Sequence, residues 1–157
     1  MGDLYIVSTP IGNLKDITFR AVETLEEVDL IFSEDTRVTK KLLHHLGIKG
    51  RIQSLNEQNE AKKTPKILQQ LSQGKSVALI SDAGTPLISD PGYCLVKQAR
   101  ENFFNIIPIP GCCAAIAALS VSGIATDKFY FHGFLPCLLY TSPSPRDLST
   151  ARMPSSA

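Results

Sequence analysis

Short apolar runs alternate along the chain with segments in which apolar residues recur at helical spacing. The apolar runs predict strands at residues 4–9, 30–35, 51–56, 76–81 and 105–111, and an aromatic run predicts a last strand at 128–136. The helical spacing predicts helices at residues 16–28, 37–47, 59–72, 92–102 and 112–123. Strands and helices that alternate in this way are typical of an α/β domain with a mainly parallel, open sheet flanked by helices.

Individual residues define the ends of several elements. Asp16 is a plausible N-cap of the first helix, and Gly47 and Gly123 would end the second and the last helix. Residues 137–157 differ from the rest of the chain, since ten of these 21 residues are Ser, Thr or Pro and show no periodicity. We interpret them as a disordered or non-native tail, more similar to an out-of-frame or vector-derived ending than to a native linker.

The composition is that of a soluble globular protein, with 43% hydrophobic and 20% charged residues. Sixteen basic and 15 acidic residues give a net charge of +1, so no overall basic field favours nucleic acid, although a local patch or a second domain would be compatible with these counts. The N-terminus has no secretory pattern and no apolar run approaches the roughly 20 residues of a membrane helix, which predicts a cytoplasmic protein without a membrane partner. Four cysteines without a CxxC spacing predict free or buried thiols and no metal site.

Unusual loops follow four of the predicted strands. They read TPIGNLKD at 9–16, SEDTR at 33–37, SDAGTPLISDPG at 81–92 and PIPGCCAA at 108–115. Because ligands of open parallel sheets bind beyond the carboxyl ends of the strands, these loops predict a small-molecule crevice, although Gly and Pro would also serve merely to turn the chain. The chain lacks G-x-G-x-x-G, G-x-x-x-x-G-K-[ST] and G-x-S-x-G, which disfavours a nicotinamide, a nucleoside triphosphate and a hydrolase triad.

The loop at 81–92 is the most constrained of the four, with two Asp, two Pro and two Gly in twelve residues. We expect Gly84 to adopt a positive φ and Pro86 to stiffen the turn, which would leave backbone groups free to bind an adenine or a methionine moiety. Asp82 would accept a hydrogen bond from a cationic or hydroxyl-bearing ligand, whereas Asp90 is expected to cap the helix that follows. The small residues of PGCCAA would let a flat ligand lie against a helix start.

The SEDTR loop has two interpretations. Glu34, Asp35 and Arg37 form either an N-cap with a local salt bridge or an acid and a clamp that face a polar substrate, with Arg37 in contact with phosphate. The adjoining Lys40-Lys41 and His44-His45 are interpreted as a solvated helix face, and a basic contribution to RNA binding is the less favoured alternative.

Five segments taken together resemble one known family. LYIVSTPIGNLKDIT, EDTR, LISDAGTPLISDPG, PIPGCCAAIAALSVSG and FYFHGFLP, in this order, are similar to the tetrapyrrole-methylase-like, class III S-adenosylmethionine-dependent enzymes. Within that group they resemble the enzymes that methylate the ribose 2′-oxygen of a cytidine in 16S rRNA of the small ribosomal subunit. The resemblance covers essentially residues 3–136 and corresponds to an N-terminal half.

The resemblance implies a two-domain subunit, usually a homodimer, whose second domain is missing here. Residues 1–125 would be the N-terminal α/β domain and 126–136 the start of the interdomain segment. The methyl donor would be S-adenosylmethionine, without a metal, and its pocket would use Pro10, Asp82, Ala83, Gly84, Thr85, Ala114 and Ala115.

The resemblance leaves the roles of the acidic loop open. Glu34 or Asp35 is expected to act as general base or to orient the substrate, and Arg37 to contact the RNA backbone. Two alternatives remain: a methyltransferase for a tetrapyrrole or another small molecule, which EDTR and the FLP ending argue against, and a folded fragment without catalysis. We expect the isolated chain to be inactive because one wall of the interdomain donor pocket would be missing.

Overall fold

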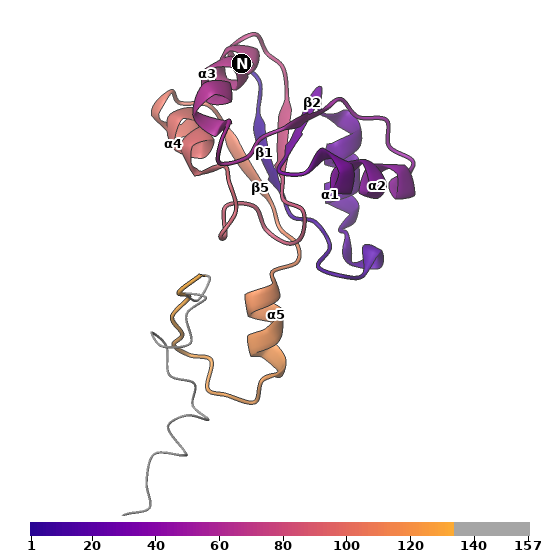
Figure 1. Cartoon of the computed structure of the whole chain (residues 1–157), viewed down its shortest axis with the longest axis vertical. Helices are drawn as coiled ribbons and strands as arrows, with labels where there is room; N and C mark the ends of the chain where they lie inside the picture. The colour runs from indigo at the N-terminus through magenta and orange to yellow at the C-terminus, as the bar shows by residue number, and fades with distance from the viewer. Residues whose placement is uncertain (134–157) are drawn as a thin grey trace, which may run out of the picture. The chain divides into compact units, whose positions relative to one another are not determined.

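The protein is built on one parallel β-sheet, as seen in a computed structural model that describes residues 1–133 (Figure 1). The strands lie in the order β3-β2-β4-β1-β5, and each pairs with its neighbours in parallel. Their bounds are β1 Leu4–Val7, β2 Leu30–Ser33, β3 Ile52–Ser54, β4 Val77–Ile80 and β5 Ile106–Ile109. The fold class and these five strands are therefore as the sequence predicts.

Helices connect the strands. They are the 3-10 turn η1 Leu14–Asp16 and the α-helices α1 Phe19–Glu27, α2 Thr36–Leu46, α3 Glu60–Ser72, α4 Tyr93–Glu101 and α5 Ala114–Val121. Gly47 ends α2 in the left-handed conformation, with φ 73°, as its position predicts. Residues 1–127 form one compact unit, and the described residues from Lys128 onward belong to a second, which is described by itself.

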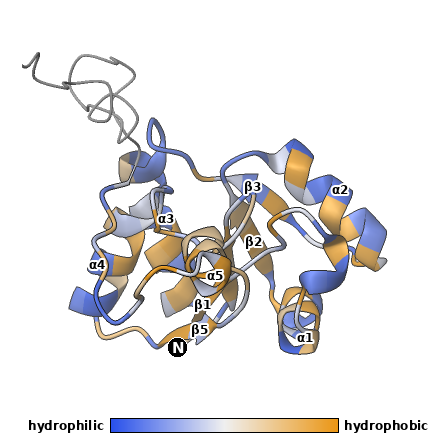
Figure 2. Ribbon diagram, turned by 90° about the horizontal axis from the view of Figure 1, so that it is seen from below, coloured by the Kyte–Doolittle hydropathy of each residue, from blue (hydrophilic) through white to orange (hydrophobic). Residues whose placement is uncertain are grey.

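The sheet has an apolar core on each face. On one face, α3 and α4 place Ile67, Leu71 and Leu95 against strand residues such as Phe32 and Leu79. On the other face, α1 and α2 pack with Leu25 and Leu43 against Ile31, Ala78 and Ile80. Figure 2 shows the two helix pairs on opposite sides of the strands. β2 and β4 are buried along their whole length, which explains why their sequences are continuously apolar instead of alternating.

Two expectations for helix starts are wrong. Thr18, not Asp16, caps α1, because the chain is still extended at Ile17 and the Thr18 side chain accepts from the Ala21 N–H at 3.2 Å. Asp90 does not cap α4, which begins two residues later than a cap at that position would require. Gly92 is the cap residue, with φ 125°, and has no side chain to bond.

The last predicted strand is also wrong as far as it is described. Residues 128–133 are not in a strand, and 134–136 lie outside the described residues. A strand needs a neighbour for its N–H and C=O groups. The described residues of this second unit offer none, and the side chains of Phe129, Tyr130 and Phe131 are exposed.

A buried carboxylate supports the start of α4. The backbone N–H of Leu95 donates to the Oε1 of Glu60 at 3.0 Å, and both residues are buried. This bond supplies a side-chain acceptor to one of the N–H groups that lack partners within the first helical turn. Glu60 begins α3, so the contact fixes the end of the 81–92 loop relative to a helix 35 residues away in sequence.

We expect Glu60→Ala to lower the free energy of unfolding by about 1–3 kcal/mol, because the buried Leu95 N–H loses this acceptor. Glu60→Gln retains an oxygen that can accept the same bond and should lose less. Urea denaturation of both variants beside the unmodified chain measures the difference. Equal losses in the two variants would contradict the capping role.

Candidate functional site

The loops that follow β1 and β4 are joined by their backbones. The Thr9 N–H donates to the Gly84 carbonyl at 2.9 Å, and the Gly84 N–H donates to the Thr9 carbonyl at 3.1 Å. The side chain of Thr9 adds a bond to the Ser81 carbonyl at 3.1 Å, and Ser81 Oγ donates to the Gly84 carbonyl at 2.8 Å. These four bonds hold the beginning of the 81–92 loop against the end of β1.

Thr85 joins a third loop to this pair. Its Oγ1 donates to the Cys112 carbonyl, which follows β5, at 3.0 Å and lies 3.0 Å from the Oγ of Ser8. Since the Thr85 hydroxyl has one proton, Ser8 is the donor in the second bond. Residues from the carboxyl ends of β1, β4 and β5 thus meet at one hydroxyl group.

Two glycines make this approach possible. Gly84 has φ 89°, as the sequence predicts, in a region that side chains with a Cβ rarely adopt. A Cβ on Gly111 would lie 2.8 Å from the Cβ of Ser8, which is closer than real Cβ contacts come. The loop after β5 can therefore pass this close to the end of β1 only because residue 111 is glycine.

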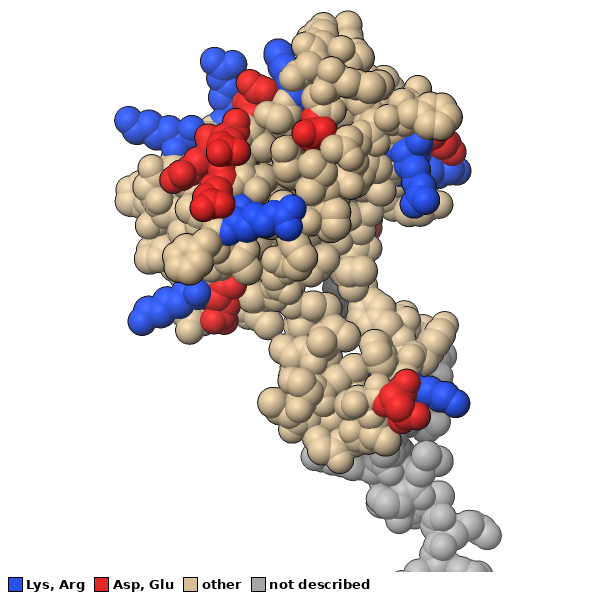
Figure 3. All heavy atoms as spheres, turned by 180° about the vertical axis from the view of Figure 1, so that it is seen from behind, with Lys and Arg blue, Asp and Glu red and all other residues tan. Residues whose placement is uncertain are grey.

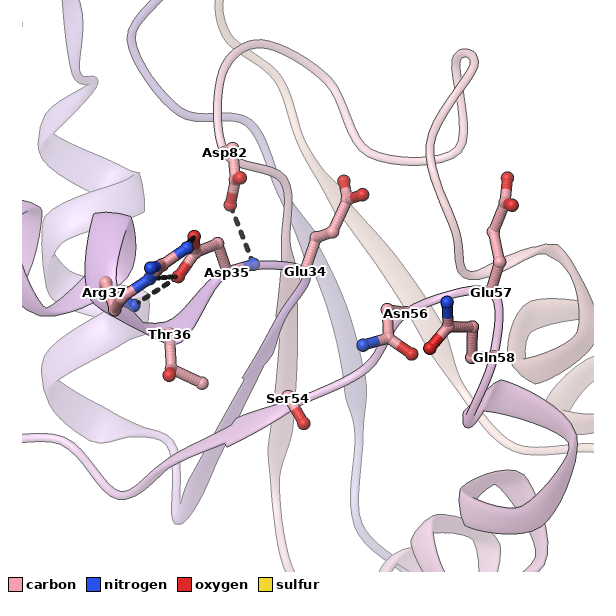
Figure 4. Close-up of a pocket in the computed structure, with 9 residues that line it drawn as sticks. All are labelled: Glu34, Asp35, Thr36, Arg37, Ser54, Asn56, Glu57, Gln58 and Asp82. Atoms are coloured by element: carbon pink, nitrogen blue, oxygen red, sulfur yellow. Dashed lines mark hydrogen bonds and ion pairs between the residues drawn. The ribbon is translucent and has the colours of Figure 1, made fainter.

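Asp82 connects the loop after β2 to the same assembly. Its Oδ1 accepts the backbone N–H of Asp35 at 3.1 Å, and Figure 4 shows the carboxylate turned toward that backbone. The sequence predicts a ligand contact for Asp82. One of its oxygens holds the start of α2, and the residue stays partly exposed.

Asp35 and Arg37 form the N-cap and the local salt bridge that are the simpler of the two interpretations. Asp35 accepts from the Arg37 N–H at 2.8 Å, and its Oδ2 lies 2.6 Å from the Arg37 Nη2. These bonds to Arg37 hold the pKa of the Asp35 carboxyl well below its usual range, at about 2. The Arg37 side chain is 86% exposed, so its outer face remains accessible to an anion.

The pKa of Glu34 is shifted in the opposite direction to that of Asp35. Although the residue as a whole is exposed, partial shielding of its carboxyl from water raises the pKa, and the neighbouring Asp82, Asp90, Glu57 and Asp35 carboxylates raise it further. A raised pKa brings a carboxylate closer to the range in which it accepts a proton efficiently.

A polar cavity of about 580 Å³ opens beside Glu34, as Figure 4 shows. It is lined by Glu34, Asp35, Thr36, Arg37, Ser54, Asn56, Glu57, Gln58 and Asp82. The lining contains four carboxylates and one guanidinium, which is already paired with Asp35. The cavity therefore favours groups that donate hydrogen bonds over anions.

A second, more apolar cavity of about 280 Å³ lies on the other side of Asp82. It is lined by Thr9, Pro10, Leu14, Val38, Lys41, Leu42 and Asp82. No signal in the sequence singles out this cavity, because its walls come from η1, α2 and two loops that meet only in the folded chain.

The residues predicted to hold a methyl donor lie on the joined loops. Pro10 and Gly84 are buried, Asp82 and Thr85 partly exposed, and Ala83 exposed. Ala114 and Ala115 are the first residues of α5 and follow the Cys112 carbonyl by two and three positions. Five of the seven thus lie on loops that share hydrogen bonds at the carboxyl ends of β1 and β4, and the other two begin the helix that follows the loop after β5.

An open parallel sheet with interconnected loops at the carboxyl ends of its strands is the architecture of an α/β protein that binds a ligand at that edge. The sequence profile of the "Tetrapyrrole (Corrin/Porphyrin) Methylases" matches residues 3–151, and the chain belongs to this family. The predicted family resemblance is therefore confirmed.

The chain is also similar to two curated proteins. The chain is 58% identical over 135 residues to a protein of Haemophilus influenzae, covering 86% of this chain and 48% of that protein. It is 56% identical over 135 residues to a protein of Escherichia coli O157:H7, covering 86% of this chain and 47% of that one. Both relatives carry the name ribosomal RNA small subunit methyltransferase I.

A solved structure has the same fold. The crystal structure of uroporphyrin-III-C-methyltransferase from Thermus thermophilus matches with a TM-score of 0.60 at 24% identity, covering 80% of this chain and 53% of that chain. The chain spans about half the length of the curated relatives it matches, which agrees with the expectation of an N-terminal half.

Within residues 1–133, no helix is both long and apolar enough to cross a membrane. Nor do the described side chains include a group of three or more His, Cys, Asp or Glu placed to hold a metal ion.

We expect Thr85→Val to lower the free energy of unfolding by about 1–3 kcal/mol, because it removes the hydroxyl that joins three loops. The Cys112 carbonyl and the Ser8 hydroxyl then lose a hydrogen-bond partner. Thr85→Ser keeps the hydroxyl and should lose less. Denaturant titrations followed by circular dichroism give both values. A valine variant as stable as the serine variant would contradict the joining role.

The two acids of the SEDTR loop should have opposite effects on the pH dependence of stability. The pKa of Glu34 lies above its ordinary 4.5 in the folded chain, so its contribution is present below that value and lost as pH rises through the raised pKa. We expect Glu34→Gln to be more stable than the unmodified chain at neutral pH, with a difference that shrinks in acid.

Asp35→Asn serves as the comparison of opposite sign. The lowered pKa of Asp35 stabilises the folded chain above the ordinary 3.8, and this stabilisation is lost as pH falls toward about 2. Asp35→Asn should therefore be less stable than the unmodified chain at neutral pH. Urea midpoints of both variants, measured from neutral pH down into acid, test the two expected changes in stability. A Glu34→Gln variant that is less stable than the unmodified chain at neutral pH would contradict the repulsion.

Proposed function

We propose that the chain is part of an enzyme that transfers a methyl group from S-adenosylmethionine to the ribose 2′-hydroxyl of a cytidine in 16S rRNA of the small ribosomal subunit. The observation that carries the proposal is the identity of more than half of the aligned residues with relatives named ribosomal RNA small subunit methyltransferase I. We also propose that the complete protein works in the cytoplasm as a homodimer.

The joined loops are suited to hold the donor. Pro10, Asp82, Ala83, Gly84, Thr85, Ala114 and Ala115 are the proposed contacts. The Thr9–Gly84 bridge and the Thr85 bonds fix these loops before any ligand arrives. Such preorganisation lowers the entropy lost on binding and on alignment of the reacting atoms.

The transfer needs an aligned acceptor and a path for one proton. The S–CH₃ bond of the sulfonium breaks as the O–CH₃ bond forms, which leaves a neutral thioether, and the hydroxyl gives up its proton. We favour Glu34 as the proton acceptor, since its pKa is raised. Asp35 is a weaker base with a pKa of about 2, and suits the role of holding Arg37 for a backbone phosphate.

The helix α5 supports the proposal of a two-domain subunit with the donor between the domains. It is apolar all round, orange to white in Figure 2, and none of its residues is buried in this unit. Ile116 is 51% and Val121 84% exposed. Exposed apolar surface of this kind gains free energy when more protein packs over it.

Two other functions remain as alternatives. A tetrapyrrole or another small molecule could be the acceptor, which the similar fold of the Thermus thermophilus enzyme favours, although 24% identity extends only to the fold. The chain by itself could also fold without catalysing any transfer. We propose that it is inactive alone, and turnover by purified residues 1–157 would contradict this.

The proposal is tested by joining this chain to the half of a relative that the chain does not cover. The joined protein is then supplied with small ribosomal subunits and with S-adenosylmethionine that carries a labelled methyl group. We expect label in 16S rRNA at a cytidine ribose. Label in a tetrapyrrole but not in RNA would favour the alternative acceptor and contradict the RNA proposal.

A matched pair of variants tests the base. Glu34→Gln should lower kcat by about 10²–10⁴-fold, the usual contribution of a positioned base. Glu57→Gln removes the same charge from the same cavity and should change kcat little. Single-turnover rates of both variants, each made in the joined protein, decide the point, and equal rates would contradict a role for Glu34 as base.

A further inference from the structure

The apolar cavity beside α2 is a candidate second subsite. Its walls are the loop after β1, the turn η1 and one side of α2, with Asp82 at its border. Val38, Lys41 and Leu42 lie three and four positions apart, so they project from the same side of the helix into the cavity. A volume of about 280 Å³ is at the small end of known small-molecule sites.

This cavity adjoins the proposed donor site without coinciding with it. The two share Pro10 and Asp82, but Ala83, Gly84 and Thr85 are not part of the cavity wall, and neither are the first residues of α5. Methyl transfer requires the acceptor oxygen to lie about 3–3.5 Å from the donor carbon. Both cavities border the donor loops at Asp82, so the acceptor nucleotide should lie across this border, with its ribose hydroxyl toward Glu34 and its base in the apolar cavity.

The charges distinguish this cavity from the polar one. Its lining contains one carboxylate, Asp82, and one ammonium group, Lys41. The helix that carries Lys41 has one Arg, two Lys, two His and no acidic residue. The polar cavity presents four carboxylates and one guanidinium, that of Arg37, which is paired with Asp35, so its interior is less favourable for phosphate. Charged groups of both signs are interspersed on the face drawn in Figure 3.

We propose that this cavity receives the base of a nucleotide of the RNA substrate, next to or at the methylated position. The side chains of Leu14 and Val38 pack on the ring, and Lys41 contacts a flanking phosphate. Single-stranded RNA is recognised in this way, by burial of a splayed base together with cationic contacts to the backbone. The inference rests on the proposed function and names the subsite for its acceptor.

A pair of adjacent lysines provides the first test. The probe is the fluorescently labelled oligoribonucleotide UUCUU, whose binding to the 157-residue chain is followed by anisotropy over a range of salt concentrations. Lys41→Gln should weaken binding severalfold and reduce the salt slope by about 0.7, the contribution of one phosphate contact in a single strand. Lys40→Gln removes the same charge one residue away, outside the cavity wall, and should stay within twofold of the unmodified chain.

A second pair of measurements tests the base. Replacement of the central cytidine by an abasic residue should weaken binding to the unmodified chain severalfold. Val38→Ser removes the apolar wall and should make binding indifferent to the abasic change. Because Val38 is 40% exposed, this substitution leaves the buried core intact, and circular dichroism checks that the variant is folded.

The outcomes are distinguishable. Equal losses for Lys41→Gln and Lys40→Gln, or no binding of the probe by the folded chain, would overturn the inference. A Lys41→Gln variant that loses S-adenosylmethionine in calorimetry but keeps the oligonucleotide would also overturn it, because the cavity would then belong to the donor. Failure of the proposed function looks different: the completed protein would not methylate RNA, although the lysine pair still differed in RNA binding.

Discussion

The position of β1 between β4 and β5 is the constraint on which the rest of the site depends. Parallel pairing on both sides of β1 brings the carboxyl ends of three strands together, although β1 and β4 are more than 70 residues apart. Thr9, Gly84 and Thr85 then convert neighbouring strand ends into one hydrogen-bonded assembly. Glycine at 84 and 111 is required because a side chain would block the close approach or the backbone conformation.

The same edge separates groups of different chemistry. Asp82 stands between an acid-lined cavity and an apolar one, and its bond to the Asp35 N–H keeps the start of α2 in place between them. The Asp35–Arg37 pair leaves Glu34 as the carboxylate that is repelled by its neighbours. The proposed positions of donor, base and acceptor thus lie on adjacent loops that meet at Asp82.

Local patterns predicted much of this fold. The five strands follow from apolar runs, and Gly47 and Gly84 adopt the conformations that their neighbours in sequence suggest. Features that depend on distant contacts were missed. Glu60 looks like an ordinary helix-start residue, and its contact with α4 depends on how two helices pack on one face. The expected strand at 128–136 failed over its described part because a strand also depends on a partner that its own sequence cannot show.

The site divides in the same way. The motif at 81–92 singles out the proposed donor loop because its Gly, Pro and Asp are concentrated in sequence. Both interpretations of SEDTR are compatible with the same residues, and only the geometry shows that Asp35 caps α2 while it pairs with Arg37. The α2 cavity has no sequence signature, since Leu14, Val38 and Asp82 become neighbours through the fold alone.

The central claim, that the loops after β1, β4 and β5 act as one donor site, is tested most directly by NMR. S-adenosylmethionine is titrated to millimolar concentration into the isotope-labelled chain while backbone amide signals are followed. The account predicts shifts at residues 8–13, 81–92 and 111–115 together, and none at Gly74 or Ser76 at the opposite edge of the sheet. A folded chain whose shifts occur elsewhere, or in only one of the three loops, would contradict it.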